Sequence, residues 1–307
     1  MTVVIKVGGA RAVDPAGALS DVASLVEQGT DAVVLHGGST KVDETLERLG
    51  IDPEYVETPS GVVGRFTDEA TMEAFEMAMP GIINTELVAS LQSLGVDAVG
   101  LSGVDGKLLA GPRKSAVRVV EDGTRKIRRG DHSGTIKQVN AGLLETLLAD
   151  GYTPVASPPM AGKDSEEWLA VNTDADRSAA AVAAALDATL VLLTDVPGIL
   201  EDPDDETTLV ESVETADDFA TLEDAAEGFM GRKVMALEEA LDGGAPEAIV
   251  ADANVDDPVL AALDGAGTHV SRQAVVENTS DGAADDAADG EDDTTADGAQ
   301  TATEGGR

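Results

Sequence analysis

The chain has 307 residues, no cysteine and a formal net charge of −39. This length allows one large α/β domain or two lobes around a sizeable core, and the lack of cysteine excludes disulfides and thiolate metal sites. The acidic surplus repels nucleic acids and anionic membranes, so we expect neither as a partner. It is tolerable near roughly 1 M salt, where the Debye length is about 3 Å, and we interpret it as the composition of a halophilic host.

Short apolar runs alternate with helical patterns through most of the chain. "VVIKV" at residues 3–7 is followed by apolar positions at helical spacing from Leu19 to Val26, and then by "AVVLHGG" at 32–38. The later runs are "AVGLSG", "TPVAS", "TLVLLTDV" and "EAIVADA". This alternation predicts an open, mostly parallel sheet flanked by helices, an αβα sandwich. We expect ligands at the carboxyl ends of its strands.

Residues 116–129, "AVRVVEDGTRKIRR", interrupt this pattern with Asp122-Gly123 between two β-prone runs. They predict a β-hairpin that protrudes from the sheet. Residues 107–137 hold nine of the twenty Lys and Arg residues, which an acidic protein partner would explain, although a solvated charged face is the alternative. The candidate docking residues are Arg113, Lys114, Arg118, Arg125, Lys126, Arg128 and Arg129.

The last segment, residues 276–307, carries ten acidic residues against one arginine and no aromatic residue. Such a composition offers no apolar surface to offset the entropy of ordering, so we expect a disordered acidic tail after a folded domain of residues 1–275. The chain has no basic leader with an apolar stretch and no apolar run long enough for a membrane span. We therefore expect a cytoplasmic protein.

Two glycine pairs are the first candidates for a ligand site. Neither G-x-G-x-x-G nor G-x-x-x-x-G-K-[ST] occurs, so the two standard nucleotide motifs are missing. Gly8-Gly9 and Gly37-Gly38 each close a predicted strand before a helical pattern, where exposed N–H groups can bind anions. Lys6 is an unusual cation for a buried strand and would suit a phosphate. A plain strand-to-helix turn is the alternative for either pair.

Two further segments carry polar candidates. Arg65 follows a glycine-rich stretch in "GVVGRFTDEAT", where it can clamp a carboxylate or simply pair with Asp68 on the surface. In "NTDADRSAAAVAAAL", Asn172 and Thr173 are candidate N-caps of an alanine-rich helix. Asp176 lies one helical turn after Asn172, so both can face one cleft.

The remaining candidates lie in the second half of the chain. "GFMGRKVMALEEAL" places Arg232 and Lys233 at a predicted helix start, where cations oppose the macrodipole and indicate a nearby anion. "LLTDVPGI" ends a buried strand in Thr194 and Asp195 before a Pro-Gly turn. That position fits a nucleotide contact, or a turn without further function.

Taken together, these segments resemble the amino-acid kinase family and its acetylglutamate-kinase-like branch over roughly residues 1–275. A narrower resemblance, to kinases that act on substrates attached to the carrier protein LysW, is carried by "TPSGVVGRFTDEAT", "DAVGLSGVDGKLL", "RKSAVRVV", "RGDHSGTIKQVN" and "LLTDVPGIL". The chain departs from the family pattern at Ser39, where a third glycine is usual, and at Gly64 and Phe66, which replace Ser and Tyr.

The resemblance implies ATP-dependent phosphorylation of the side-chain carboxylate of LysW-bound glutamate or 2-aminoadipate in arginine or lysine biosynthesis. It implies a substrate lobe of about residues 1–165 and a nucleotide lobe of about residues 166–275. Magnesium would be carried by the nucleotide and not by a metal site of the protein. The implied residues are Lys6, Lys233 and Asp176 for catalysis; Gly37, Gly38, Arg65 and Asn172 for the substrate; and Gly8, Gly9, Thr194 and Asp195 for the nucleotide.

Two alternatives stay open at this point. One is a kinase for free N-acetylglutamate, which would need no basic docking surface. The other is a nucleotide-binding regulator on the same fold that has lost catalysis. Glutamate and 2-aminoadipate differ by one methylene, worth only about 1–3 kcal/mol of discrimination, so the sequence does not choose between them. By the same resemblance we expect a homodimer.

Overall fold

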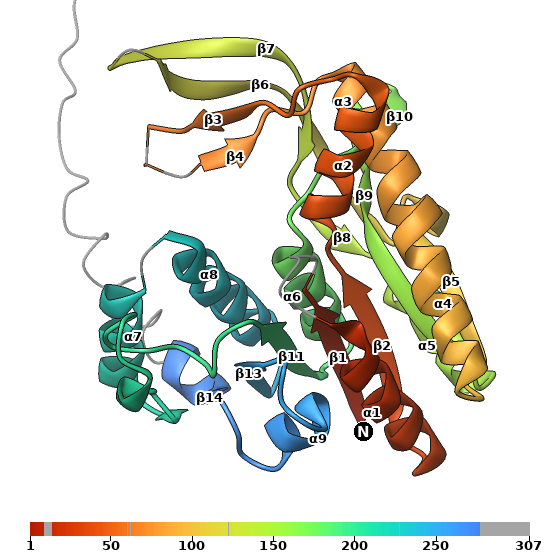
Figure 1. Cartoon of the computed structure of the whole chain (residues 1–307), viewed down its shortest axis with the longest axis vertical. Helices are drawn as coiled ribbons and strands as arrows, with labels where there is room; N and C mark the ends of the chain where they lie inside the picture. Colours follow the sequence, from red (N-terminus) through yellow and green to blue (C-terminus); the bar gives the residue numbers. More distant parts are fainter. Residues whose placement is uncertain (9–13, 60, 62, 122, 227, 277–307) are drawn as a thin grey trace, which may run out of the picture.

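The computed structural model describes residues 1–8, 14–59, 61, 63–121, 123–226 and 228–276. Within these residues twelve strands form one mixed sheet in the order β12-β14-β13-β11-β1-β2-β9-β6-β7, with β5 and β10 also on β9 and β8 on β6. The central strands are parallel: β1 (Thr2–Val7), β2 (Asp31–His36), β11 (Thr189–Thr194) and β13 (Glu247–Asp252). The predicted open, mostly parallel sheet flanked by helices is confirmed (Figure 1).

The other strands extend this sheet on both sides. β9 is twice as long as the predicted run because its second half continues as the partner of β10 and β6. Beyond β13, β14 runs antiparallel to it and pairs with the edge strand β12. The strand bounds are β5 (Ala98–Gly103), β6 (Leu109–Glu121), β7 (Thr124–Gly134), β8 (Gln138–Val139), β9 (Thr153–Asp164), β10 (Glu167–Val171), β12 (Ser212–Val213) and β14 (Thr268–Ser271).

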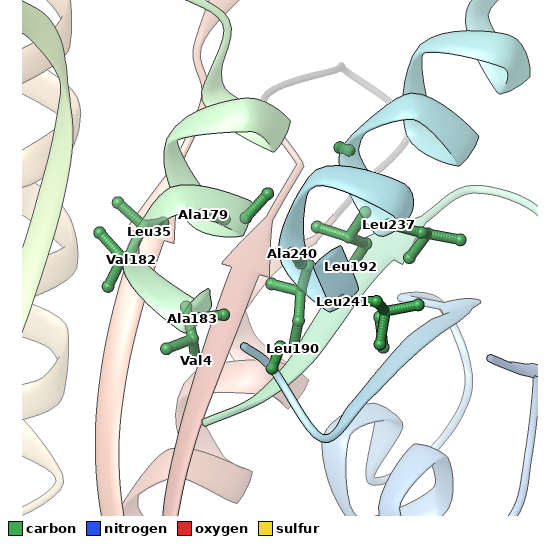
Figure 2. Close-up of a cluster of buried hydrophobic side chains, with 14 of the residues drawn as sticks. Val4, Leu35, Ala179, Val182, Ala183, Leu190, Leu192, Leu237, Ala240 and Leu241 are labelled. Atoms are coloured by element: carbon green, nitrogen blue, oxygen red, sulfur yellow. The ribbon is translucent and has the colours of Figure 1, made fainter. Parts of the chain in front are cut away.

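Successive side chains of the central strands alternate between two apolar layers, as the period of two requires. One layer packs under α6 (Ala175–Ala185) and α8 (Gly228–Asp242). The small alanine side chains of α6 allow this helix to pack closely on the sheet (Figure 2). The other packs under α1 (Pro15–Glu27), α4 (Asn84–Ser93) and α9 (Pro258–Leu263). The strand residues of the first layer include Val4, Leu35, Leu190 and Leu192, and those of the second include Val3, Ile5, Val34, Val191 and Leu193.

A third, smaller apolar cluster joins α2 (Ser39–Leu49), α3 (Glu69–Glu76) and the π-helical segment Met77–Ile83. Pro80 lies inside that segment and has no N–H for a helical hydrogen bond, which is consistent with the departure from α-helical pairing. Two further helices are α5 (Ala141–Ala149) and α7 (Ala216–Ala225), and 3₁₀ turns lie at Asp105–Lys107 and Glu206–Thr208.

Strands β6 and β7 form the predicted hairpin, with Glu121 paired to Thr124 at its tip. Figure 1 shows it extending away from the helices, beside a second hairpin of β3 (Tyr55–Glu57) and β4 (Val63–Arg65). The second hairpin was not predicted, although Pro59 and Gly61 between two β-prone stretches are a turn signal. Almost all of the predicted acidic tail, residues 277–307, lies outside the described residues. None of the helices in the described part is long and apolar enough to cross a membrane.

Candidate active site

A cleft of about 760 Å³ opens where the parallel strands β1, β2 and β11 end. Because β1 lies between β2 and β11, the residues that follow these three strands meet at one edge of the sheet. All the predicted catalytic, substrate and nucleotide residues line this cleft except Gly9, which lies outside the described residues. They are Lys6, Gly8, Gly37, Gly38, Arg65, Asn172, Asp176, Thr194, Asp195 and Lys233.

Lys6 is buried because it extends the apolar layer that Val4 begins. Two residues apart on β1, both side chains leave the sheet on the side of α6 and α8. Asp176 lies in the first turn of α6, and its Oδ1 is 2.8 Å from the Lys6 Nζ. On α8, the Nζ of Lys233 donates to the other oxygen, Oδ2, at 3.1 Å. One carboxylate therefore holds two ammonium groups at the floor of the cleft.

The charge state of this group follows from its surroundings. Burial alone would raise the pKa of Asp176, but the charges and hydrogen bonds of Lys6 and Lys233 outweigh burial and lower the pKa to about 2. The carboxylate is thus ionised at neutral pH. Two ammonium groups and one carboxylate leave a net positive charge in a mostly buried position, which favours an anionic ligand.

Two sequence predictions about these helices are wrong. The N-cap of α6 is Asp174, whose carboxylate accepts hydrogen bonds from the N–H groups of Asp176 and Arg177, and not Asn172 or Thr173. α8 begins at Gly228, so Lys233 lies in its second turn. The macrodipole acts mainly within the first turn, so Lys233 is explained by its ion pair with Asp176.

A buried histidine supports the turn at Gly37-Gly38. His36, the last residue of β2, has Nδ1 2.9 Å from the Gly37 carbonyl oxygen and Nε2 3.1 Å from the amide nitrogen of Asn84. Burial, reinforced by the charge of Lys6, lowers the pKa of His36 to about 4. The ring is therefore neutral, with Nδ1–H donating to Gly37 and Nε2 accepting from Asn84. Sequence analysis treated His36 only as the end of an apolar run and missed this role.

Gly38 lies against two apolar side chains. A Cβ there would lie 2.2 Å from Cδ1 of Ile83 and 2.5 Å from Sδ of Met79, so a side chain would have to displace both. Gly38 directly precedes α2, and both it and Gly37 line the cleft. Their backbone thus approaches the cleft without a side chain in the way.

Arg65 is held by a polar cluster that the sequence did not reveal. Its Nη2 donates to the hydroxyl oxygens of Tyr55 at 2.8 Å and Ser39 at 3.0 Å, and its Nη1 pairs with Asp43. The alternative pairing with Asp68 is wrong, because that carboxylate caps α3. Ser39, the departure from the family pattern, therefore has a defined contact. The β3–β4 register sets Tyr55 opposite Arg65, which no local sequence pattern indicated.

Asn172 and the two residues after β11 complete the cleft. The side-chain amide of Asn172 donates to Oγ1 of Thr67 at 3.0 Å. On the other side of β1, Thr194 ends β11 and donates its hydroxyl to Oδ1 of Asp195 at 3.2 Å. Asn172 thus lies on the side of the cleft near β2, β4 and β10. Thr194 and Asp195 lie on the other side, near β11 and α8.

The predicted docking residues do not share one surface, contrary to the sequence prediction. Arg113 has only 14% of its side chain exposed and pairs with Asp164 at 2.8 Å, and Lys114 lines the cleft. The reason is that net charge along the sequence does not indicate which cations already have partners.

Two more of these cations are engaged within the chain. Lys126 pairs with Glu121 at 2.8 Å. Arg128 pairs with Glu54 and lies over the Phe66 ring, 4.2 Å from its centroid. The hydrogen bonds to Glu54 raise the pKa of Arg128, so it stays charged.

The other three arginines share the outer face of the β6–β7 hairpin. Cross-strand partners in an antiparallel pair lie on the same face, and the register pairs Arg118 with Ile127, Val120 with Arg125 and Ala116 with Arg129. All three arginines are exposed, and Ile127 is 66% exposed. We call Arg118, Arg125, Ile127 and Arg129 the outer hairpin face.

Comparisons with known proteins identify the family of this chain. Residues 1–252 match the sequence model of the amino acid kinase family. The [LysW]-aminoadipate kinase of Deinococcus radiodurans is 45% identical over 88% of this chain and 91% of that protein. The acetylglutamate kinase of Methanopyrus kandleri is 41% identical over 80% and 93%. The solved structure of N-acetylglutamate synthase from Neisseria gonorrhoeae, complexed with coenzyme A and N-acetyl-glutamate, gives a TM-score of 0.68 at 25% identity, covering 88% of this chain and 59% of that longer one. The chain belongs to the amino acid kinase family.

Proposed function

We propose that this chain transfers the γ-phosphoryl group of ATP to the side-chain carboxylate of glutamate or 2-aminoadipate carried by LysW. The observation that carries the proposal is the pair of ammonium groups of Lys6 and Lys233 on Asp176, in the same cleft as Arg65 and Asn172. The relatives support the substrate class, since the protein from Deinococcus radiodurans is named [LysW]-aminoadipate kinase.

The reaction is an in-line displacement. A carboxylate oxygen of the acceptor attacks the γ-phosphorus, the bond from that phosphorus to the bridging oxygen breaks, and the products are an acyl phosphate and ADP. Two anions must be brought together, so positioning and charge stabilisation dominate and little covalent work is left to the protein. In our proposal Lys6 and Lys233 stabilise the transferring phosphoryl group, and Asp176 holds both ammonium groups in position.

We assign the two sides of the cleft to the two substrates. On the side of β2, β4 and β10, the N–H groups of Gly37 and Gly38, the Arg65 guanidinium and the Asn172 amide bind the amino-acid part of the acceptor. On the other side, Gly8, Thr194 and Asp195, with Gly9 from the sequence pattern, contact ATP. The net positive charge at the floor of the cleft is complementary to the negative charge of a nucleoside triphosphate. Its Mg²⁺ would be held mainly by the phosphates and water.

We propose the outer hairpin face as the docking surface for the acidic carrier. Three exposed arginines around an exposed isoleucine offer both charge complementarity and an apolar contact. The base of the same hairpin reaches the cleft at Ser133 and Gly134, so a carrier seated there can present its attached amino acid to the site. Lys114, which lines the cleft, belongs in this proposal with the ligand and not with the docking surface.

Calorimetric titration of purified carrier into the enzyme tests this docking proposal. We expect saturable binding that weakens as salt rises, since exposed charges are screened. A carrier that does not bind at low salt would contradict it.

Phosphorylation of free N-acetylglutamate is the second candidate, and the relative from Methanopyrus kandleri, named acetylglutamate kinase, supports it. It predicts full turnover in the absence of any carrier. A regulator without catalysis is a third reading. Against it stands the association of Lys6, Asp176 and Lys233 in the cleft, and an ATP turnover assay decides.

The proposal includes three expectations about the protein's setting: a cytoplasmic location, a homodimer and operation at high salt. Composition and resemblance support them. Light scattering and activity measured across a salt series test the last two.

A further inference from the structure

Two buried polar side chains lie behind the cleft. Thr67 is fully buried and Asp131 is 3% exposed, and neither belongs to the described residues that line the cleft. Thr67 follows Arg65 by two positions, and Asp131 lies near the end of β7. Neither residue was singled out by its sequence pattern or used in the proposed reaction.

Thr67 makes hydrogen bonds through three of its atoms to two distant segments. Its N–H donates to Oδ1 of Asp131 at 3.2 Å, and its carbonyl oxygen accepts from the N–H of His132 at 2.7 Å. Its Oγ1 accepts from the side-chain amide of Asn172 at 3.0 Å. These hydrogen bonds connect the segment that carries Arg65 both to the end of β7 and to the Asn172 side chain.

The end of β7 is fastened to Asn172 as well. The N–H of Asn172 donates to the His132 carbonyl oxygen at 2.7 Å, and the N–H of Gly134 donates to the Asn172 carbonyl oxygen at 2.9 Å. Asp131 also accepts from Ser133 through its second carboxylate oxygen. The base of the hairpin therefore contacts both segments that supply the proposed acceptor contacts.

The partly buried Arg113 belongs to the same assembly. Its Nη2 donates to the Asp131 carbonyl oxygen at 3.2 Å, while its Nη1 pairs with Asp164 on β9. This links the hairpin base to the central sheet. These contacts explain why Arg113, in a basic segment, is only partly exposed.

We infer that Thr67 and Asp131 are positioning residues that hold Arg65 and Asn172 in register with each other and couple both to the base of the β6–β7 hairpin. The part of this inference that concerns the acceptor rests on the proposed function. The bond from Asn172 to Thr67 fixes the plane of the amide, and the bond from Thr67 to Asp131 fixes the strand end that carries Arg65. Binding of a partner to the hairpin would thereby affect the positions of both Arg65 and Asn172.

The first test is the substitution Thr67→Val, which keeps the shape of the side chain and removes the acceptor for Asn172. For whichever acceptor the wild type phosphorylates, we expect its KM to rise about tenfold, the loss typical of one buried hydrogen bond. The KM for ATP should stay within about twofold. Thr67→Ser should restore the acceptor KM, because it restores the hydroxyl.

Thr45→Val is the matched control. Thr45 is also buried, and its hydroxyl donates to the Lys41 carbonyl oxygen at 2.7 Å, within α2. This variant should keep the wild-type KM for the acceptor. A folded Thr67→Val enzyme with unchanged acceptor KM, or a rise of equal size in Thr45→Val, would overturn the positioning role.

Hydrogen exchange of the protein without ligands gives a readout that does not depend on the reaction. We expect amides in segments 129–135 and 170–174 to exchange faster in Thr67→Val than in wild type or Thr45→Val. Unchanged exchange would overturn the coupling. If the wild type phosphorylates neither acceptor, the proposed function fails while this measurement still decides the coupling.

Asp131→Ala serves if Thr67→Val does not fold. It removes both carboxylate oxygens, and with them both hydrogen bonds that they accept from Thr67 and Ser133. This variant should also raise the KM of the acceptor and speed the exchange of amides in segments 129–135 and 170–174. Both effects should be smaller than in Thr67→Val. Wild-type values of both would contradict the inference.

Discussion

The ammonium nitrogen of Lys6 lies 2.8 Å from Oδ1 of Asp176, which joins the end of the central strand β1 to the first turn of α6. Such a contact is costly to bury unless each charge has a partner, and here the carboxylate is shared with Lys233. The arrangement leaves one positive charge in excess beside the cleft.

Lys6→Ala and Lys233→Ala should each lower kcat by about 10²–10³-fold with a much smaller change in substrate KM. The reason is that their charges matter most while the phosphoryl group transfers. Steady-state kinetics measure this. Lys163→Ala is the control, since that exposed lysine lies near the Trp168 ring and outside the cleft lining. Near-wild-type kcat in either cleft variant would rule out the proposed role.

Arg65→Gln should raise the KM of the acceptor about tenfold to a hundredfold, because a charged hydrogen-bond partner is lost. Tyr55→Phe removes one hydroxyl that accepts from Arg65 and should raise the same KM by a smaller factor. The KM for ATP should not change in either variant, and Arg48→Gln, on the exposed end of α2, serves as control. Equal effects on both KM values would contradict the assignment of Arg65 to the acceptor.

His36 should make stability depend on pH between about 6.5 and 4. In this window the unfolded chain protonates the histidine, whereas the folded chain, with a pKa of about 4, does not. The free energy of unfolding therefore falls as pH drops, by about 3 kcal/mol over the whole window. Denaturant titrations at neutral pH and near pH 4.5 should show a smaller loss for His36→Gln than for wild type. Identical losses would mean that His36 is not held neutral.

Reversal of Arg118, Arg125 and Arg129 to Glu should raise the KM for a carrier-bound acceptor while leaving the KM for ATP unchanged. These exposed arginines are not among the residues that line the cleft, and they act through encounter and register with the carrier. High salt should reduce the difference from wild type.

The control for that variant is the same charge change placed elsewhere. Arg48, Lys163 and Arg272 are all exposed and none lies on the hairpin, so their reversal to Glu matches the net charge of the first variant. If both variants use the carrier equally well at low salt, the outer hairpin face is not the docking surface.

The central parallel strands, the β6–β7 hairpin and the main residues of the cleft could be predicted because each has a local pattern. Lys6 follows an apolar run, Gly37-Gly38 closes another, and parallel strands bring their ends together. Asp43 and Tyr55 could not be found in this way. They reach Arg65 only through the fold of the β3–β4 hairpin and the packing of α2, which no periodicity encodes.

The prediction that the basic residues of this segment share one surface was wrong for a related reason. The basic segment suggested one surface, but the two-residue alternation of β6 and β7 sends Arg118 and Arg125 outward and Arg128 toward Phe66. Arg113 lies deeper, where Asp164 approaches from β9. Alternation along each strand was readable from the sequence, whereas the pairing register and the partner of each cation required the structure.

The most direct test of the central claim is mass spectrometry of LysW carrying glutamate or 2-aminoadipate after incubation with the enzyme, ATP and magnesium. The account predicts one added phosphoryl group on at least one of these carriers, removed by hydroxylamine as expected of an acyl phosphate. It also predicts that Lys6→Ala abolishes the added mass on the same time scale. Unmodified carriers alongside rapid phosphorylation of free N-acetylglutamate would contradict the account and make the free-substrate kinase the correct assignment.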